Sequence, residues 1–274
     1  MKNLERLKEI YLLSFTDDTK EDADFLFENV FSHAVSLTKE KDGQTASMLY
    51  LMECTVNTKD KALPFYYLYA ACTHPKYRGR GLMGALLEDA KKFAEENKKE
   101  GIILKPAKPS LFDFYKKYGF DPFFKVYTAL LGAEDLKKYT KCNKYELSLE
   151  QWHGLRFSVL KNISDCFLTF PKDVFCAAAN GCRVATDAKG SYVVYEVRED
   201  LLLCKECIVG ELGAEGVLAI ARTLAEELNV KRAELRFPPC TKLSNTGLGK
   251  TSFFSVTSNQ GLTAHNPYHG FAFD

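Results

Sequence analysis

The residues best suited to chemistry in this chain lie at positions 78–84, where the sequence is Arg-Gly-Arg-Gly-Leu-Met-Gly. A strand-like apolar run ends shortly before this segment, and an amphipathic helix pattern begins inside it. Glycines at such a junction let the backbone turn tightly and expose N–H groups at a helix N-terminus, where the peptide dipoles favour negative charge. Arg78 and Arg80 add two positive charges with the planar geometry that binds phosphate. The segment therefore predicts a phosphate or pyrophosphate site.

The glycines of this segment also fit the dinucleotide pattern G-x-G-x-x-G, which is weak on its own. A Rossmann site needs its first glycine directly after the strand and an acidic residue about 20 positions later. Here residues 73–77 separate the strand-like run from Gly79, and the next such run, 102–104, is followed by Lys105 and not by Asp or Glu. A Walker A loop is excluded too, because no Gly-Lys-Ser/Thr follows at its spacing.

Two motifs in order carry a more specific signal. Residues 71–82, Ala-Cys-Thr-His-Pro-Lys-Tyr-Arg-Gly-Arg-Gly-Leu, combine a strand end, a Pro and an aromatic with Arg-x-x-Gly-like spacing. Residues 114–120, Phe-Tyr-Lys-Lys-Tyr-Gly-Phe, suit a short helix ended by a glycine turn. Together they resemble the acetyl-CoA signature and the second landmark of the GNAT superfamily of N-acetyltransferases. The resemblance covers roughly residues 25–130.

This resemblance implies an acetyl-CoA-dependent N-acetyltransferase that moves an acetyl group directly from the thioester to a primary amine. It implies that the loop at 78–84 holds the pyrophosphate and that Tyr115 protonates the leaving thiolate. A phenol suits that role because its pKa of about 10 lies near that of a thiol. The implied cofactor-binding residues are Cys72, Thr73, Arg78, Gly79, Arg80, Gly81, Leu82, Met83 and Gly84.

Two residues depart from the family pattern. Met83 stands where Gly or Ala is usual, so its side chain must point away from the pyrophosphate. Lys108 stands where many members have Asn, which affects side-chain contacts to the cofactor. The general base stays open between Glu53, His74 and a water chain. Three tyrosines of the central strand either line the acceptor pocket or pack the sheet: Tyr66, Tyr67 and Tyr69.

Composition narrows the possible partners. The 274 residues carry a net charge of +1 from 37 basic and 36 acidic side chains, which gives no support to nucleic-acid or membrane-surface binding. No run approaches about 18 consecutive apolar residues, and the N-terminus lacks an apolar signal core, so a cytoplasmic protein is expected. The expected acceptor is a small-molecule or peptide amine, and the oligomeric state stays open.

The cysteines are expected to be structural. Nine are scattered along the chain, and without a secretory signal an odd number favours reduced thiols. Cys204 and Cys207 form a C-x-x-C pair inside an apolar strand-like run, and no second pair completes a metal site. We therefore interpret them as strand residues and expect no metal.

Periodicity predicts an α/β chain whose second half repeats the element order of the first. The resemblance implies a GNAT-like mixed central sheet flanked by helices, followed by a second, smaller GNAT-like α/β unit. The expected domains are 1–132 and 145–274, joined by a polar connection at 133–144. The first contains a hairpin of strands 45–56 and 63–73, a helix 82–97, a strand 102–104 and a short helix 111–118. The second repeats that order with strands 191–197 and 201–209, a helix 216–228 and a strand 232–238.

The second half is expected to lack the chemistry. At its strand-to-helix junction Glu211 and Glu215 stand where the first half has arginines, and like charge beside a pyrophosphate is unfavourable. The aromatic end at 268–274 is either an untethered terminus or a segment that folds back on the core near the acceptor cleft. A non-catalytic acyl-CoA-binding or regulatory module is the alternative to an enzyme.

Overall fold

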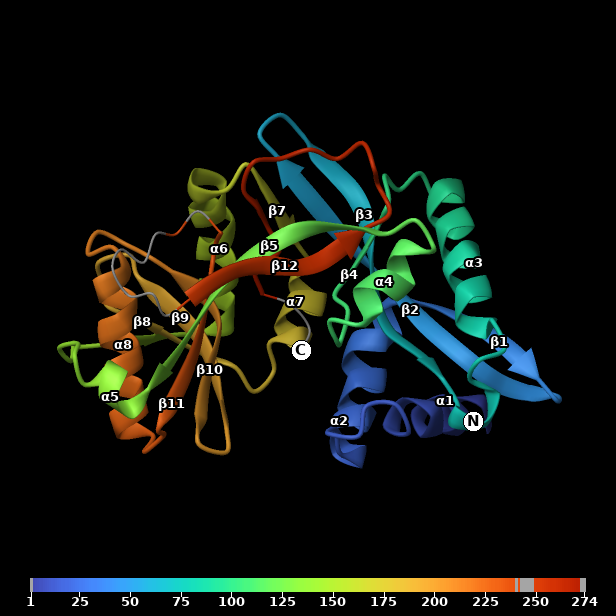
Figure 1. The fold of residues 1–274 in the computed structure, drawn as a ribbon, viewed down its shortest axis with the longest axis horizontal. Coiled ribbons are helices and arrows are strands. Elements are labelled where there is room, and N and C mark those ends of the chain that lie inside the picture. The colour runs from blue at the N-terminus through green and yellow to red at the C-terminus, as the bar shows by residue number, and fades with distance from the viewer. Residues whose placement is uncertain (1, 240, 242–248, 272–274) are drawn as a thin grey trace. The chain divides into compact units, whose positions relative to one another are not determined.

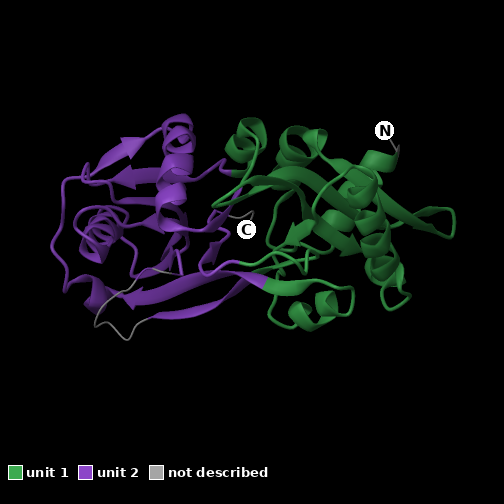
Figure 2. Ribbon diagram, turned by 90° about the horizontal axis from the view of Figure 1, so that it is seen from above, with its two compact units in different colours: residues 1–122, 169–178, 255–263 green, residues 123–168, 179–254, 264–274 purple. Residues whose placement is uncertain are grey.

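The computed structural model describes residues 2–239, 241 and 249–271. The chain forms two compact units of helices and strands (Figure 2). Unit 1 consists of residues 1–122, 169–178 and 255–263, and unit 2 of residues 123–168, 179–254 and 264–274. The mixed α/β class is confirmed. The domain boundaries at 132 and 145 stay a prediction, because the compact units are assembled from separated stretches of chain.

Unit 1 is built on the expected hairpin. Strands β2 and β3 pair antiparallel, and β4 continues the sheet parallel to β3 (Figure 1). Strand β1 pairs with the other edge of β2. In chain order the elements of this unit are α1 (Lys2–Leu12), α2 (Lys20–Phe25), a π-helical turn (Leu26–Val30), a 3₁₀ turn (Phe31–His33), β1 (Val35–Lys41), β2 (Gln44–Thr58), β3 (Ala62–Thr73), a second 3₁₀ turn (Pro75–Tyr77), α3 (Leu82–Glu96), β4 (Ile102–Leu104), α4 (Leu111–Lys116) and α7 (Lys172–Ala178).

Helix α3 covers one face of this sheet. It packs against β1, β2 and β3, while α1 packs against β2 and β3. Its residues Leu86, Ala90 and Ala94 are buried, because their spacing places them on one stripe of the helix. Leu82 and Phe93 are partly exposed.

A late segment of the chain completes unit 1. Strand β12 (Gly249–Thr257) pairs antiparallel with β4 through Val256 and Thr257. The backbone N–H of Ile102 donates to Ser258 Oγ at 2.8 Å, and Asn259 Nδ2 donates to the carbonyl of Glu100 at 2.7 Å. Val256 is also fully buried in the hydrophobic core under α3. Unit 1 therefore depends on residues far beyond its first 122.

Unit 2 repeats the same local topology. Strands β9 and β10 form an antiparallel hairpin, α8 follows, and β11 lies parallel to β10. Strand β5 borders β11 antiparallel, as β12 borders β4 in unit 1. The elements are β5 (Asp121–Gly132), α5 (Ala133–Leu136), β6 (Tyr145–Leu147), α6 (Leu149–Ile163), β7 (Cys166–Thr169), β8 (Arg183–Thr186), β9 (Tyr192–Arg198), β10 (Leu201–Ile208), α8 (Ala214–Glu227), β11 (Arg232–Phe237) and β13 (Pro267–Tyr268).

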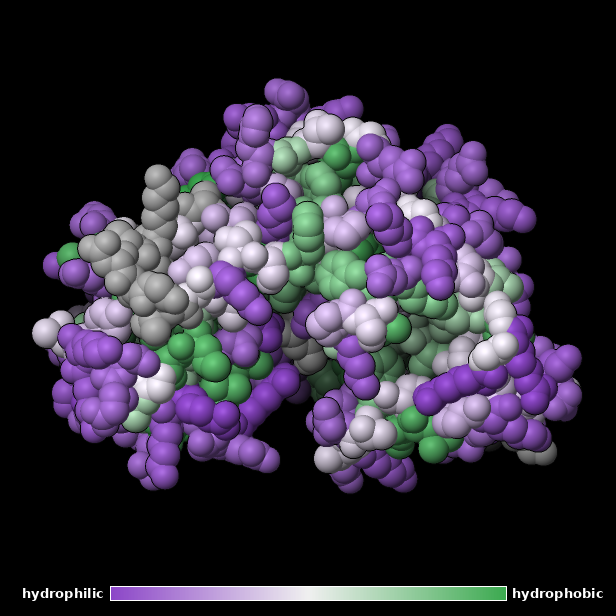
Figure 3. All heavy atoms as spheres, viewed as in Figure 1, coloured by the Kyte–Doolittle hydropathy of each residue, from purple (hydrophilic) through white to green (hydrophobic). Residues whose placement is uncertain are grey.

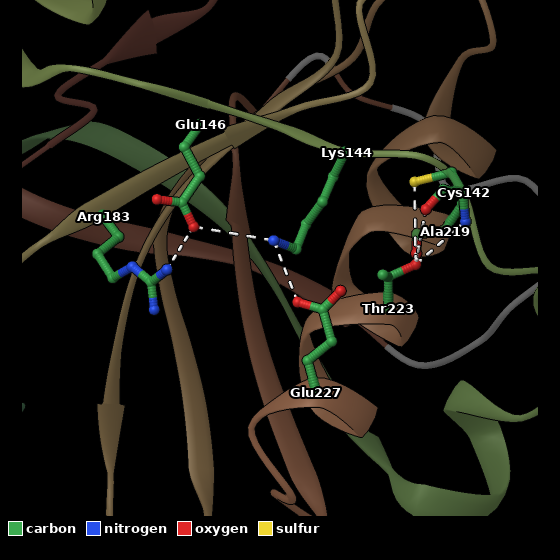
Figure 4. Close-up of polar contacts among 7 residues, drawn as sticks. All are labelled: Cys142, Lys144, Glu146, Arg183, Ala219, Thr223 and Glu227. Carbon is green, nitrogen blue, oxygen red and sulfur yellow. Dashed lines mark hydrogen bonds and ion pairs between the residues drawn. The ribbon is translucent and has the colours of Figure 1, made fainter.

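The polar connection at 133–144 is bound to α8. The backbone N–H of Cys142 donates to Thr223 Oγ1 at 3.1 Å, and Lys144 Nζ lies 3.1 Å from Glu227 Oε2 (Figure 4). The same ammonium lies 3.8 Å from Glu146, which also pairs with Arg183. These contacts fix the start of β6 beside the helix.

The aromatic end folds back on unit 2 as far as Phe271, and residues 272–274 lie outside the described residues. Tyr268 pairs with Phe167 of β7 and with Lys125 of β5. The backbone N–H of Phe271 donates to Glu206 Oε2 at 3.0 Å, where Glu206 and Arg156 form a buried ion pair at 3.0 Å. The segment is therefore held by a fully buried carboxylate.

The structure places both Cys204 and Cys207 in strand β10, where both are buried. Burial raises the pKa of the Cys207 thiol well above its ordinary value, so this thiol is inert at neutral pH. The strand interpretation of the C-x-x-C pair is confirmed, while Cys240 lies outside the described residues.

On the face seen in Figure 3, hydrophilic side chains predominate. No helix in the described parts of the chain is long and apolar enough to cross a membrane.

Candidate active site

The site predicted from the sequence begins with an irregularity in β3 that the sequence did not reveal. The register with β2 shifts between Met48 and Tyr50, which leaves Ala70 and Ala71 opposite a single residue. Ala70 has φ 50°, in the left-handed region that residues with a Cβ rarely adopt. Such strain persists only where the surroundings enforce it, and it is frequent at functional sites. This bulge lies directly before the segment expected to bind the cofactor.

The bulge changes which side chains share a face of the sheet. On a regular strand, residues three apart face opposite sides, whereas one extra residue restores them to the same side. Tyr69 and Cys72 therefore face the same side, as do their partners Tyr50 and Met48 on β2. This side is the one that carries Phe31, whose ring stacks on Tyr50 at 4.1 Å.

The loop after β3 turns on two glycines in the left-handed conformation. Gly79 and Gly81 both have φ 74°, which glycine adopts without strain. A Cβ atom built on either would meet no heavy atom within 4 Å, so the space beside both is open. Gly81 is the N-cap of α3, whose first N–H groups have no partner inside the helix. The loop thus presents free backbone donors at the positive end of a helix dipole.

The two arginines of the loop are held differently. Arg78 Nε donates to the carbonyl of Thr73 at 3.0 Å, and its Nη2 donates to Ser14 Oγ at 3.3 Å, so this side chain ties the loop to its surroundings. The guanidinium of Arg80 lies over the ring of Tyr77, 5.4 Å from its centroid. Tyr77 is fully buried, so its ring is a fixed support for the guanidinium of Arg80. Arg80 itself is exposed. Arg80 is the freer cation for a phosphate.

The first turn of α3 explains two more of the predicted residues. Met83 packs against the hydrophobic core of unit 1, so its side chain does not occupy the free space beside Gly79 and Gly81. Leu82 is partly buried beside it. Gly84 is buried, and a Cβ atom there would lie 2.2 Å from the hydroxyl of Tyr118. The absence of a side chain at Gly84 therefore lets the Tyr118 ring lie against the helix.

Tyr115, the predicted acid, lies on α4 and is buried at 7% exposure. Burial, and secondarily the nearby thiol of Cys72, raise the pKa of Tyr115 to about 12. The phenol is therefore protonated at neutral pH and close enough to Cys72 for the two to interact. The structure brings α4 and the end of β3 together, as the two motifs require.

Cys72 itself is a buried strand residue. Burial raises the pKa of its thiol to about 12, while a hydrogen bond with Ser14 lowers that pKa. A thiol that stays protonated is a poor nucleophile, so the geometry does not favour an acyl-cysteine. Thr73, at the strand end, bonds through its hydroxyl with Ser47 Oγ at 2.8 Å.

Among the described residues, the strand β4 lies beside only part of β3. The ladder with β4 joins Tyr66 to Ile102 and Tyr67 to Ile103, and β4 ends at Leu104. Strand β3 continues to Thr73. Within the described residues, its backbone beyond the β4 ladder is therefore a sheet edge. An extended molecule with amide groups can add to such an edge.

Both candidate side-chain bases from the sequence have partners within unit 1. His74 Nδ1 accepts a hydrogen bond from the backbone N–H of Lys76 at 3.2 Å and caps the turn that follows. Glu53 pairs with Lys99 at 2.7 Å. Its partner on β3 is Tyr66, four residues before the bulge at Ala70. Four residues of strand span about 13 Å, which separates Glu53 from the bulge.

Glu53 and Lys99 instead line a separate pocket of about 330 Å³ in unit 1. The other residues that line it are Cys54, Thr55, Pro64, Thr169, Phe170 and Pro171. Among residues 2–239, 241 and 249–271, no group of three or more His, Cys, Asp or Glu side chains is placed to hold a metal ion.

The corresponding junction in unit 2 has a carboxylate beside it, although the N-cap Gly213 has free space as Gly81 does. A Cβ atom on Gly216, in the first turn of α8, would lie 2.3 Å from Ser191 Oγ and 2.6 Å from Asp187 Oδ2. Asp187 Oδ1 accepts from the backbone N–H groups of Lys189 and Ser191 at 2.8 and 3.0 Å. A carboxylate of the chain itself thus lies against the first turn of α8, where α3 has the phenol of Tyr118 against Gly84.

Residues 2–123 match the family model described as an acetyltransferase (GNAT) domain. Residues 2–123 are therefore similar to a GNAT acetyltransferase domain, and the matched residues include both sequence motifs. No curated relative matches the sequence.

Solved structures with low sequence identity share the fold of nearly the whole chain. A protein of Enterococcus faecalis V583 described as a probable N-acyltransferase is 18% identical, with a TM-score of 0.72 over 93% of this chain and 70% of that chain. A GCN5-related N-acetyltransferase of Anabaena variabilis is 13% identical, with a TM-score of 0.72 over 94% and 70%. One from Kribbella flavida is 12% identical, with a TM-score of 0.66 over 93% and 68%.

Proposed function

We propose that this protein transfers the acetyl group of acetyl-CoA directly to a primary amine of a small molecule or peptide. The observation that carries this proposal is the open space beside Gly79 and Gly81 at the N-terminus of α3. Free N–H groups, a helix dipole and the exposed Arg80 suit a pyrophosphate there. The open edge of β3 suits the amides of the pantetheine arm, beside Cys72 and Thr73.

Acetyl-CoA supplies the activated acyl group as a thioester. Backbone N–H groups at the end of β3 are available to polarise its carbonyl. Tyr115 holds a proton for the sulfur that leaves, and burial keeps that phenol protonated until it is needed. The amine nitrogen forms the new bond to carbon, the carbon–sulfur bond breaks, and the amine loses one proton.

A thiol-release assay with acetyl-CoA and a panel of alkyl-, aryl- and peptidyl-amines tests the proposal, with acetyl-CoA binding measured by calorimetry. We expect binding together with thiol release that depends on an amine. Tight binding without turnover on any amine would instead support an acyl-CoA-binding or regulatory module. Binding of NAD(H) but not of acetyl-CoA would contradict both interpretations of the loop.

A further inference from the structure

A chain of hydrogen bonds leads away from the bulged end of β3. Tyr69 on β3 is hydrogen-bonded to the phenol of Tyr11 on α1. The hydroxyl of Tyr11 lies 2.5 Å from Asp18 Oδ2. An ionised carboxylate can only accept, so Tyr11 donates to Asp18, and Tyr69 donates to the oxygen of Tyr11. The three side chains therefore form one directed series from the strand to the carboxylate.

This series begins at the position where the acyl group is expected. Because of the bulge at Ala70, Tyr69 faces the same side of the sheet as Cys72. The turn that carries Asp18 reaches the same place, since Ser14 bonds with the Cys72 thiol and with Arg78 Nη2. The residues involved all belong to unit 1.

The burial along the series suits the passage of a proton. Tyr69 is half-buried, Tyr11 is fully buried, and Asp18 is half-buried. Burial raises the pKa of Tyr69 to about 12 and that of Tyr11 well above its ordinary value, so both phenols stay neutral. Neutral hydroxyls pass protons without carrying net charge. Asp18 is then the one group of the three that can keep a proton and exchange it with water.

The walls around Tyr69 favour a cation with an apolar body. Phe15 stacks on Tyr11 with ring centroids 4.5 Å apart and on Tyr69 at 6.4 Å. Phe31 lies 5.9 Å from Tyr69. Aromatic faces attract ammonium groups, and the charge of Asp18 adds to that attraction. The guanidinium of Arg78, on the loop after β3, is bound to Thr73 and Ser14.

We propose that the Tyr69–Tyr11–Asp18 series is the route by which the acceptor, an alkylammonium ion with an apolar or aromatic body, loses its proton. The inference rests on the proposed function. One proton leaves the ammonium nitrogen for the oxygen of Tyr69, the proton of Tyr69 passes to Tyr11, and that of Tyr11 passes to the Asp18 carboxylate. The neutral amine then attacks the thioester, and Asp18 returns the proton to water. The two bases considered from the sequence are both engaged elsewhere, Glu53 with Lys99 and His74 with its own turn.

Asp18→Asn and Tyr11→Phe test the route with two kinds of acceptor. With an alkylamine, which is mostly protonated at neutral pH, we expect either variant to lower turnover by about 10²-fold, the low end for a lost base. With a hydrazine or arylamine, which is already neutral, the loss should shrink to a few-fold. A merely structural effect would lower both rates alike. Affinity for acetyl-CoA, measured by calorimetry, should not change.

Two variants serve as matched controls. Tyr50→Phe removes a phenol from the same aromatic group whose hydroxyl bonds to Ser36 and not to Asp18. Asp24→Asn removes a carboxylate that pairs with Lys8 at 2.6 Å. Both should keep wild-type rates with both acceptors, and thermal melting should show that all four variants fold.

The outcomes separate this inference from the proposed function. If the wild type acetylates amines and Asp18→Asn matches it on alkylamines, the route is wrong and the proposed function stands. Equal losses on both acceptors overturn the route as well, because they indicate a structural effect. If the wild type acetylates no amine, the proposed function fails, and the route fails with it.

Discussion

The starts of α3 and α8 occupy the same place in two copies of one local topology, yet the groups that lie against their first turns differ. Each helix follows an antiparallel hairpin and leads into a strand parallel to the second strand of that hairpin. Both N-cap glycines, Gly81 and Gly213, have free space beside them. The third residue of each helix is a glycine too, and a Cβ atom there would meet the neutral phenol of Tyr118 in α3 but Ser191 and the carboxylate of Asp187 in α8.

The difference teaches that free space at a helix N-terminus does not by itself make an anion site, because the charge beside it matters as well. The sequence indicated an inactive second junction from Glu211 and Glu215. Both are exposed, whereas the carboxylate that lies against the first turn of α8 is Asp187 from the turn between β8 and β9. This carboxylate therefore comes from a residue outside the junction itself.

The largest expected effect concerns the completeness of unit 1. A fragment of residues 1–140 lacks residues 169–178 and 255–263 of that unit. It therefore loses Val256, which pairs with β4, and the hydrogen bonds of Ser258 with Ile102 and of Asn259 with Glu100. We expect this fragment to aggregate, because the core under α3 loses one wall. Size-exclusion chromatography measures this, and co-expression of residues 141–274 is the control that should restore solubility. A soluble, fully active fragment would show that the exchanged segments contribute nothing.

The next effect concerns Tyr115, the proposed acid, which belongs to unit 1 like α3. Tyr115→Phe keeps the ring in the core of unit 1 and removes the hydroxyl, so folding and acetyl-CoA affinity should barely change. Turnover should fall by about 10²-fold, which steady-state kinetics would detect. Tyr118→Phe, on the next turn of the chain, is the matched control. Wild-type turnover in Tyr115→Phe would assign the proton to Tyr118, water or another group.

The third effect concerns the positive charge of the two arginines in the loop before α3. Arg78→Glu combined with Arg80→Glu places carboxylates beside the expected pyrophosphate. The loss of a charge-assisted hydrogen bond costs about 1.5–3 kcal/mol, so acetyl-CoA affinity should fall tenfold or more in calorimetry. Of the single variants, Arg80→Glu should act mainly on affinity. Arg78→Glu should also lower the melting temperature, because Arg78 bonds to Thr73 and Ser14. Unchanged affinity in the double variant would refute the loop assignment.

A smaller effect is expected from adding a methyl group to the first turn of α8. Gly216→Ala would force a Cβ atom against Ser191 and Asp187, and overpacking typically costs about 1–3 kcal/mol. Denaturant unfolding should show that loss, with no change in acetyl-CoA affinity. Gly154→Ala is the control on another helix, because its Cβ atom would meet nothing within 4 Å. Equal stability of both variants would mean that the junction is not tightly filled.

The last prediction is an absence of effect. The whole chain should bind one acetyl-CoA per polypeptide in calorimetry, despite the repeated topology. Glu211→Arg combined with Glu215→Arg should leave that stoichiometry at one, because the carboxylate of Asp187 still lies against the first turn of α8. A value near two in the wild type would overturn the contrast between the junctions. A value near two in the variant alone would place the cause in the two glutamates.

The sequence predicted what is local. The hairpin ending at Thr73, helix α3, strand β4 and the turn at Gly119 follow from periodicity, glycine and apolar runs within short windows. The second hairpin with α8 and β11 was found in the same way. Residues that act through the backbone, such as Gly79 and Gly81, could be predicted because their type signals a conformation.

What the sequence could not predict depends on distant partners. Nothing at Ala70 marks a bulge, since alanine ordinarily avoids positive φ. Asp18 sits in a polar turn like many others, and its importance appears only when Tyr11 and Tyr69 meet it. The pairing of β12 with β4 joins residues more than 150 positions apart, where no short pattern can specify a partner.

The exchange of segments between the two units also has a consequence in time. Ribosomes add roughly 5–20 residues per second, and domains near the N-terminus usually fold while the rest is still being made. Here the strand that borders β4 includes Val256 and Thr257, so unit 1 cannot close until long after its motifs have emerged. The core under α3 stays exposed for about ten seconds of synthesis at these rates. During that interval we expect chaperones to bind the nascent chain. A chain truncated before Val256 should not be an active enzyme.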